Sequence, residues 1–386
     1  MSGRNRIRVA FINHWAKDLG GAEHSLLAVI AAVKEDFDVH LVTTEAGPLV
    51  DRVSAMGVAC HIVPCSNSVK KLKRWGLLRH LLFSWPVVVA FILYCVRLRR
   101  VIRTIHPQII HGNVPKSHMA LFFLVKTGFK GKCCIHVREI FEKRSTSKKL
   151  YTVLFPRRDC TVIAISVCVK DNLPAVMRRK AEIIYNGIPI PGRPKKYAVG
   201  ETIKLLYLGR IVPWKGCHLL IDILCMARNK YRQTSLELSL VGDTMYWASD
   251  YKGLLRKKIE DRNLSHCCRL LPYTDDPVTA FEAHDIFCIA SDHEPFGRSI
   301  AEAQASGMPV IAFDSGGVSE IVQNNLSGIL LPFNDCKKFA DALGTFIENP
   351  GLMRTMGLQG RKNVTRRFDV RQQGPLLHDY FSRLLQ

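Results

Sequence analysis

The stretch EPFGRSIAEAQASGMPVIAFDSGG, residues 294–317, carries the clearest structural signal in the chain. We predict a loop at its start and a helix that begins near Ser299 and ends at Gly307. Glycine tolerates the left-handed conformation found after helix ends, and Pro309 cannot extend the helix. The apolar run from Val310 to Phe313 then predicts a buried strand.

The start of this helix is suited to bind a phosphate. Backbone N–H groups of a first helical turn have no acceptor within the helix, and the helix dipole adds positive charge there. Carboxylates would repel a diphosphate but accept hydrogen bonds from sugar hydroxyls, and Glu294 and Glu302 bracket the site. The pattern therefore favours a nucleotide-sugar; the alternative is a surface helix with two solvated glutamates. The first-turn residues are Gly297, Arg298, Ser299 and Ile300.

Glu294-x7-Glu302 within this stretch resembles the signature of retaining glycosyltransferases of family 4, which have the GT-B fold. The resemblance implies that Glu302 holds the ribose of the donor and that Glu294 holds a hydroxyl of the transferred sugar. It also implies that the backbone amides of Phe296, Gly297 and their neighbours surround the sugar and diphosphate. The implied fold class is α/β, with two Rossmann-like domains facing across a cleft.

The net charge of +22 is concentrated in the first half of the chain. Residues 1–186 contain 30 lysines and arginines against 12 acidic residues, so +18 of the charge lies there. No acidic residue occurs between Asp51 and Glu139. Such a field attracts polyanions, and the candidates are an anionic membrane, a phosphorylated substrate and nucleic acid. With 386 residues, 47% of them hydrophobic, the chain is long enough for two globular domains.

The cysteines favour a reducing compartment. There are 13 of them, scattered without CxxC spacing, which argues against a disulfide framework and a structural zinc site. We expect no metal and no cofactor. MSGRNRIRVAFI lacks the pattern of a cleavable signal peptide, so we expect a cytoplasmic active face.

The first domain is predicted for residues 1–186. A strand from Ile7 to Ile12 leads into a loop that ends in Gly20 and Gly21, before a helix. Strand, glycine pair and helix form a second backbone cradle for phosphate. GGAE at residues 20–23 resembles the first loop of family 4 enzymes, which implies that it approaches the donor phosphates.

Residues 70–105 break the alternation of strands and helices. KKLKRWGLLR, residues 70–79, is basic, and a nearly pure apolar run from Leu81 to Val96 follows, closed by four arginines. This run is shorter than the roughly 20 residues of a membrane span, and Pro86 would interrupt it. We favour a segment lying on the cytoplasmic leaflet; the alternatives are a core helix with a cationic outer face and, least favoured, a span.

Two segments are candidates for the acceptor site. Asn113 and Lys116 lie in the loop and helix after a predicted strand. The strand from Lys132 to Val137 ends near His136 and Arg138, and ligands bind at such carboxyl ends in open parallel sheets. The resemblance implies that His136 lies close to the transferred sugar; the alternative is a buried structural histidine.

A proline- and glycine-rich segment, residues 187–201, predicts a hinge before a second domain at 202–370. In its first loop, Arg210 and Lys215 follow a strand end. Two fixed cations there would stabilise a departing diphosphate where a metal would otherwise be needed, and the resemblance implies this role. The last helix, about residues 371–386, is expected to pack back on the first domain.

Three further residues complete the expected donor site. Gly242 and Asp243 follow a strand and would lie near the base, and Tyr273 would help to frame it. Arg298 stands where family 4 frequently has an aliphatic residue, which changes the character of the donor pocket.

We therefore expect a retaining, metal-independent hexosyltransferase of the bacterial surface-polysaccharide type. It would move a sugar from a UDP- or GDP-sugar to a lipid-linked or other glycan acceptor, in lipopolysaccharide, capsule or exopolysaccharide synthesis at the inner membrane face. The expected catalytic residues are His136, Glu294, Arg210 and Lys215. One alternative is a soluble transferase or phosphorylase acting on a small sugar. A nucleic-acid-binding protein is more distant, because it leaves residues 294–317 unexplained.

Overall fold

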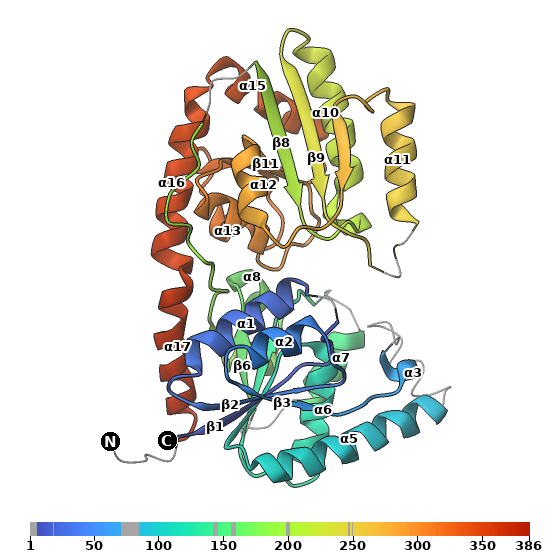
Figure 1. Ribbon diagram of the computed structural model, residues 1–386, viewed down its shortest axis with the longest axis vertical. Helices are drawn as coiled ribbons and strands as arrows, with labels where there is room; N and C mark the ends of the chain where they lie inside the picture. Colours follow the sequence, from blue (N-terminus) through green and yellow to red (C-terminus); the bar gives the residue numbers. More distant parts are fainter. Residues whose placement is uncertain are drawn as a thin grey trace. The chain divides into compact units, whose positions relative to one another are not determined.

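The computed structural model describes residues 6–17, 19–70, 85–141, 146–155, 160–197, 201–245, 248 and 250–386. The chain divides into two compact units, each built on a parallel sheet (Figure 1). The first unit comprises Met1–Gly187 and Val370–Gln386, and the second comprises Ile188–Asp369. Two Rossmann-like α/β domains were the predicted fold class, and this prediction is confirmed.

The first unit contains a seven-stranded sheet in the order β3-β2-β1-β4-β5-β6-β7. Parallel strands that are covered on both faces bury consecutive residues. Strand β4 shows this, since all four of its residues, IIHG, are buried. The strands are β1 (Arg8–Ile12), β2 (Asp38–Thr43), β3 (Ala59–Ile62), β4 (Ile109–Gly112), β5 (Lys132–Val137), β6 (Cys160–Ala164) and β7 (Ala181–Ile183). Helices described in this unit include α2 (Pro48–Ser54), α3 (Asn67–Lys70), α7 (Thr146–Leu154), α8 (Val167–Asn172) and α9 (Ala175–Arg178).

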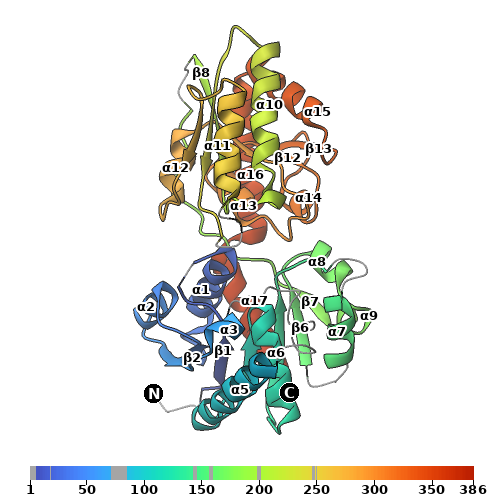
Figure 2. The ribbon, with the colours of Figure 1, turned by 90° about the vertical axis from the view of Figure 1, so that its right-hand side faces the viewer.

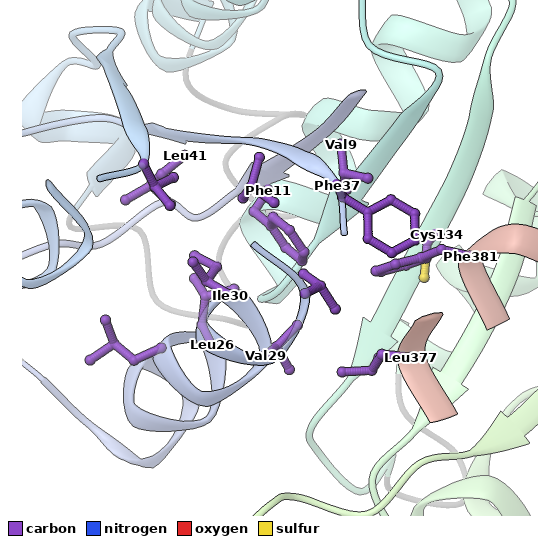
Figure 3. Packing of buried hydrophobic residues seen from close by; sticks show 14 of the residues in the cluster. Val9, Phe11, Leu26, Val29, Ile30, Phe37, Leu41, Cys134, Leu377 and Phe381 are labelled. Carbon is purple, nitrogen blue, oxygen red and sulfur yellow. The ribbon is translucent and has the colours of Figure 1, made fainter. Parts of the chain in front are cut away.

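The last helix of the chain completes the core of this first unit. Helix α17 (Val370–Arg383) packs beside α1 (Gly21–Val33), and its Leu377 and Phe381 are fully buried. The ring centre of Phe381 lies 6.2 Å from that of Phe11 in β1 and 5.7 Å from that of Phe37, and Figure 3 shows these residues in one cluster with Leu377. Burial of apolar surface stabilises a fold by about 25 cal/mol per Å². Helix α17 therefore contributes to the stability of the first unit.

Helices α5 (Trp85–Ile105) and α6 (Pro115–Lys126) cover the opposite face of this sheet (Figures 1 and 2). Pro86 does not interrupt α5: it occupies the first turn, where its missing N–H costs nothing. None of the helices described for this chain combines the length and hydropathy that crossing a bilayer requires. Apart from Lys70, the basic stretch at 70–79 lies outside the described residues, as do residues 81–84 of the apolar run.

One stripe of α5 buries Tyr94, Leu98 and Ile102 in the first unit. The outward stripe is also apolar over the first part of the helix and becomes cationic toward its end, at Arg97, Arg100 and Arg103. Its exposed apolar side chains are Trp85 at 76%, Ile92 at 44%, Leu93 at 51% and Val96 at 38%. The helix is therefore a core element on one side and a solvent-facing apolar surface on the other.

The second unit contains a six-stranded sheet in the order β10-β9-β8-β11-β12-β13. Its strands are β8 (Thr202–Leu208), β9 (Ser235–Val241), β10 (Cys268–Leu271), β11 (Ile286–Ile289), β12 (Val310–Phe313) and β13 (Gly328–Leu331). Its helices are α10 (Cys217–Lys230), α11 (Tyr251–Asp261), α12 (Pro277–Ala283), α13 (Arg298–Ala305), α14 (Val318–Ile321), α15 (Cys336–Glu348) and α16 (Gly351–Phe368). Helices α10 and α11 lie on one side of the sheet and α16 on the other (Figure 2).

The proline-rich segment after Gly187 is anchored to the second unit in its described part. Lys195 N–H donates to the carbonyl of Ser306 at 2.8 Å, and Tyr197 Oη donates to the carbonyl of Gly307 at 3.1 Å. Arg361 of α16 donates to the carbonyl of Pro191. Residues 188–197 are thus held along the surface of this unit by backbone acceptors.

Candidate functional site

The loops after β8 and β11 leave the second sheet at the point where its strand order reverses. In the order β10-β9-β8-β11-β12-β13, β8 is followed by β9 on one side and by β11 on the other. Ligands of open α/β sheets bind in the crevice outside the carboxyl ends of strands at such a point. The first loop contains Arg210 and Lys215, and the second contains Glu294.

Lys215 and Glu294 meet in this crevice although 79 positions separate them. The Lys215 ammonium donates to Oε2 of Glu294, and the two side chains are only 12% and 7% exposed. Lys215 also lies 4.5 Å from the ring centre of Trp214. A pair so well shielded from water is geometrically fixed, because neither partner gains by pointing elsewhere.

Backbone contacts bring the two loops together. Gly216 has φ 71°, and a Cβ there would lie 2.1 Å from the carbonyl oxygen of Ala290. Asp292 N–H donates to the carbonyl of Trp214 at 2.8 Å. The loop after β12 is joined in the same way, since Gly317 N–H donates to the carbonyl of Glu294 at 2.7 Å. Glycine at 216 is therefore required by both conformation and space.

Helix α13 begins at Arg298, after Gly297 with φ 96°. Its first-turn amides are the predicted phosphate cradle. Within the helix, Arg298 Nε donates to Oε1 of Glu302 at 2.7 Å, and both side chains are less than one-fifth exposed, at 16% and 19%. Burial raises the pKa of Glu302 above its usual range, and Arg298 opposes this rise. The side chain of Ile300 is buried, so only its backbone N–H can belong to the predicted phosphate cradle.

The other predicted donor residues lie at the same edge of the sheet, with less contact to the pair. Arg210 is exposed, and its carbonyl accepts a hydrogen bond from Tyr207 Oη at 2.7 Å. Asp243 accepts from Lys252 Nζ at 3.0 Å and from the N–H of Tyr273 at 3.3 Å. Gly242 approaches Gly209 so closely that a Cβ would lie 1.9 Å from its carbonyl oxygen.

The first unit holds a separate polar network at the carboxyl ends of β4 and β5. Arg138 Nε donates to Asn113 Oδ1 at 2.7 Å, and its Nη1 donates to Asn186 Oδ1 at 2.6 Å. His136 lies beneath, fully buried, with Nδ1 3.3 Å from Arg138 Nη2 and 3.2 Å from His111 Nε2. Burial, with Arg138 adding to it, holds the pKa of His136 well below its usual range.

The remaining predicted residues of the first unit are placed as follows. Gly20 precedes α1, and its N–H donates to Glu23 Oε2 at 3.1 Å, so a side chain of this chain accepts from the predicted phosphate cradle. Lys116 is half-buried at the start of α6, and burial lowers its pKa to about 8. Among the residues that the structure describes, no group of histidines, cysteines and carboxylates is arranged to hold a metal ion.

Residues 192–363 match the model of the family Glycosyl transferases group 1. This match covers most of the second unit. An uncharacterized glycosyltransferase of Methanocaldococcus jannaschii is 30% identical over 206 residues, 52% of this chain and 53% of that protein. A lipopolysaccharide core biosynthesis glycosyltransferase of Rhizobium meliloti is 27% identical over 214 residues, 52% of this chain and 60% of that protein. The chain spans little more than half the length of these relatives.

Solved structures of the same architecture cover nearly the whole chain. HepE from Anabaena, determined in complex with UDP and glucose, matches with a TM-score of 0.80 at 22% identity, over 97% of this chain and 99% of HepE. At this identity the likeness establishes the fold. The chain therefore has the GT-B fold, with a parallel sheet in each of its two units.

Several residues of both sites were not singled out from the sequence. Trp214 joins the loops of the second unit through its ring and its carbonyl. In the first unit, Asn186 and His111 contact Arg138 and His136. A weak signal existed for each: Trp214 lies between the two predicted cations, His111 lies near the carboxyl end of the buried strand β4, and Asn186 follows β7.

Proposed function

We propose that this protein is a retaining, metal-independent hexosyltransferase that uses a nucleotide-diphosphate sugar, most simply a UDP- or GDP-sugar. One observation carries the proposal: two glutamates, Glu294 and Glu302, each lie beside a cation at the switch point of the second sheet, around the start of α13. The arrangement offers acceptors for hydroxyls and donors for a diphosphate within one crevice. UDP and glucose bound to HepE are consistent with it.

The proposed roles follow from charge. First-turn amides of α13 and the side chains of Arg210 and Lys215 bind the diphosphate and stabilise the charge that develops on it as it leaves. Glu302 accepts from the ribose hydroxyls, and Glu294 accepts from a hydroxyl of the transferred sugar. Gly242, Asp243 and Tyr273 border the base. In the first unit, the backbone amides of Gly20 and Gly21 are a further candidate for binding phosphate.

The proposed acceptor is a lipid-linked or other glycan, bound by Asn113, Lys116 and Arg138 in the first unit. The outward stripe of α5 supports a peripheral location on an anionic membrane surface, because exposed apolar side chains followed by arginines match acyl chains and anionic headgroups. The relative from Rhizobium meliloti acts in lipopolysaccharide core biosynthesis. Surface-polysaccharide synthesis at the inner membrane face is therefore the proposed setting.

Calorimetry with nucleotides tests the donor site directly. We would titrate UDP, GDP, ADP and CMP into the protein in EDTA, and then into Glu302→Ala. The control variant is Glu348→Ala, at the exposed last residue of α15. We expect one diphosphate to bind wild type and control alike, and Glu302→Ala to bind it about 10- to 100-fold more weakly, the effect of losing one or two charge-assisted hydrogen bonds. If no nucleotide binds in EDTA, the proposal is wrong.

A further inference from the structure

The guanidinium of Arg138 is held by three neutral acceptors on three different segments of the first unit. Nε donates to Asn113 Oδ1 at 2.7 Å, Nη1 donates to Asn186 Oδ1 at 2.6 Å, and Nη2 lies 3.3 Å from His136 Nδ1. Asn113 is itself held, since its Nδ2 donates to Asn13 Oδ1 at 3.0 Å. These contacts fix the direction in which each nitrogen of the Arg138 guanidinium donates.

This geometry decides which nitrogen of His136 carries the proton. A guanidinium can only donate, so the Nδ1 atom that faces it must accept, and the single proton of a neutral imidazole then belongs to Nε2. His111 Nε2 faces the same Nδ1 atom at 3.2 Å and must also be a donor, because two lone pairs would otherwise meet. The opposite tautomer of His136 would put an N–H against Arg138.

The proton on Nε2 has no acceptor in the described part of the chain. His136 is fully buried, and its Nε2 makes no hydrogen bond there. Buried donors are almost always satisfied in proteins, and an exception needs an explanation such as a ligand or ordered water. His118, the third histidine of this cluster, differs in this respect, since Nε2 contacts the carbonyl of Gly112 at 3.1 Å.

We infer that Arg138 is a positioning residue that holds His136 in the neutral Nε2–H tautomer, so that His136 acts as a hydrogen-bond donor to a ligand oxygen and not as a proton acceptor. The tautomer follows from the contacts within the first unit alone. The statement about the ligand rests on the proposed function.

Nitrogen NMR of the full chain, selectively labelled with ¹⁵N-histidine, measures the tautomer. The signals of His136 are identified by their loss in His136→Asn. We expect a protonated Nε2 and an unprotonated Nδ1 in the wild type, the same in Arg138→Lys, which keeps a cationic donor, and a mixture or reversal in Arg138→Met. A protonated Nδ1 in the wild type overturns the inference, whatever the variants do.

A second readout separates donation from proton transfer. A glutamine amide can donate from a position near Nε2, whereas an asparagine amide replaces Nδ1. With the nucleotide-sugar that binds, we expect His136→Gln to lose less than about tenfold in turnover and His136→Asn to lose at least about a hundredfold, the scale of one essential contact. Equal losses above a hundredfold, with nucleotide affinity kept, contradict the donor role. If no sugar is transferred, the proposed function fails while the NMR result still decides the tautomer.

Discussion

Arg298 Nε lies 2.7 Å from Oε1 of Glu302, one turn apart on α13. Family 4 frequently has an aliphatic residue at position 298, so this ion pair is a feature of this chain and not one that the resemblance implies. The contact occupies one carboxylate oxygen and leaves the other for the proposed ribose hydroxyls. It also opposes the rise that burial causes in the pKa of Glu302.

Arg298→Leu should therefore raise the pKa of Glu302 further. The unfolded chain releases the proton of such a carboxyl at lower pH than the folded chain does. The free energy of unfolding therefore falls as pH rises from the pKa of the unfolded chain through that of the folded chain. In Arg298→Leu this fall should be larger and extend to higher pH, by about 1.4 kcal/mol for each unit of additional shift.

Urea unfolding of the wild type and of Arg298→Leu, from about pH 4 to pH 8, measures this difference. The same substitution in a Glu302→Gln background is the control, because glutamine does not titrate. A pH-dependent effect of Arg298→Leu that persists in that background would show that another group is responsible.

Lys215→Ala should lose both turnover and stability. It leaves the carboxylate of Glu294 buried without its cation, and breaking a buried pair in this way typically costs about 3–5 kcal/mol. Turnover should fall by about a hundredfold or more, because a fixed cation at the leaving diphosphate is lost.

The double variant Lys215→Met with Glu294→Gln separates the two effects. It removes both charges at similar volume, so thermal unfolding should return close to the wild-type temperature while turnover stays low. Recovery of turnover together with stability would mean that Lys215 is only a structural residue.

Gly216→Ala should strongly destabilise the second unit. The backbone at Gly216 has φ 71°, and the added Cβ would lie 2.1 Å from the Ala290 carbonyl oxygen, an atom of a buried strand end that cannot move away cheaply. We expect a loss above about 2 kcal/mol, since left-handed strain and a backbone clash add. Gly253→Ala is the matched control: it lies within α11 with nothing within 4 Å of the added Cβ, and should stabilise slightly.

The outward stripe of α5 should bind anionic vesicles. Reversing the charge of three arginines on it should abolish sedimentation with vesicles of anionic lipid, because each is worth about 1 kcal/mol at such a surface, and high salt should release the wild type. The variant is Arg97→Glu, Arg100→Glu and Arg103→Glu. A control with the same change in charge on exposed positions of the second unit is Lys337→Glu, Arg354→Glu and Lys362→Glu.

Retention of binding by the α5 variant, or its loss in the control as well, would contradict a localised membrane contact. No binding by the wild type would favour a transferase or phosphorylase that acts on a small soluble sugar. Salt-sensitive binding of RNA or DNA by the same arginines would instead support the nucleic-acid alternative.

The sequence by itself determined what depends on near neighbours. Alternating apolar runs and turn residues predicted the two α/β sheets, and the helix at α13 begins and ends within one residue or two of its predicted bounds, at Arg298 and Ala305. Strand ends also located Arg210, Lys215 and Glu294, because each follows a short buried run. These signals act over a few residues, where backbone sterics and side-chain periodicity operate.

Only the tertiary structure decided which of these residues touch. Lys215 and Glu294 are 79 positions apart, and Arg138 and Asn186 are 48 apart, so their contacts depend on strand order and not on spacing. The apolar pattern of α5 likewise could not tell its buried stripe from its exposed one, because both are apolar. Packing against the sheet determines which stripe of α5 is buried. Burial depends on which elements the fold brings together, and the local sequence does not encode this.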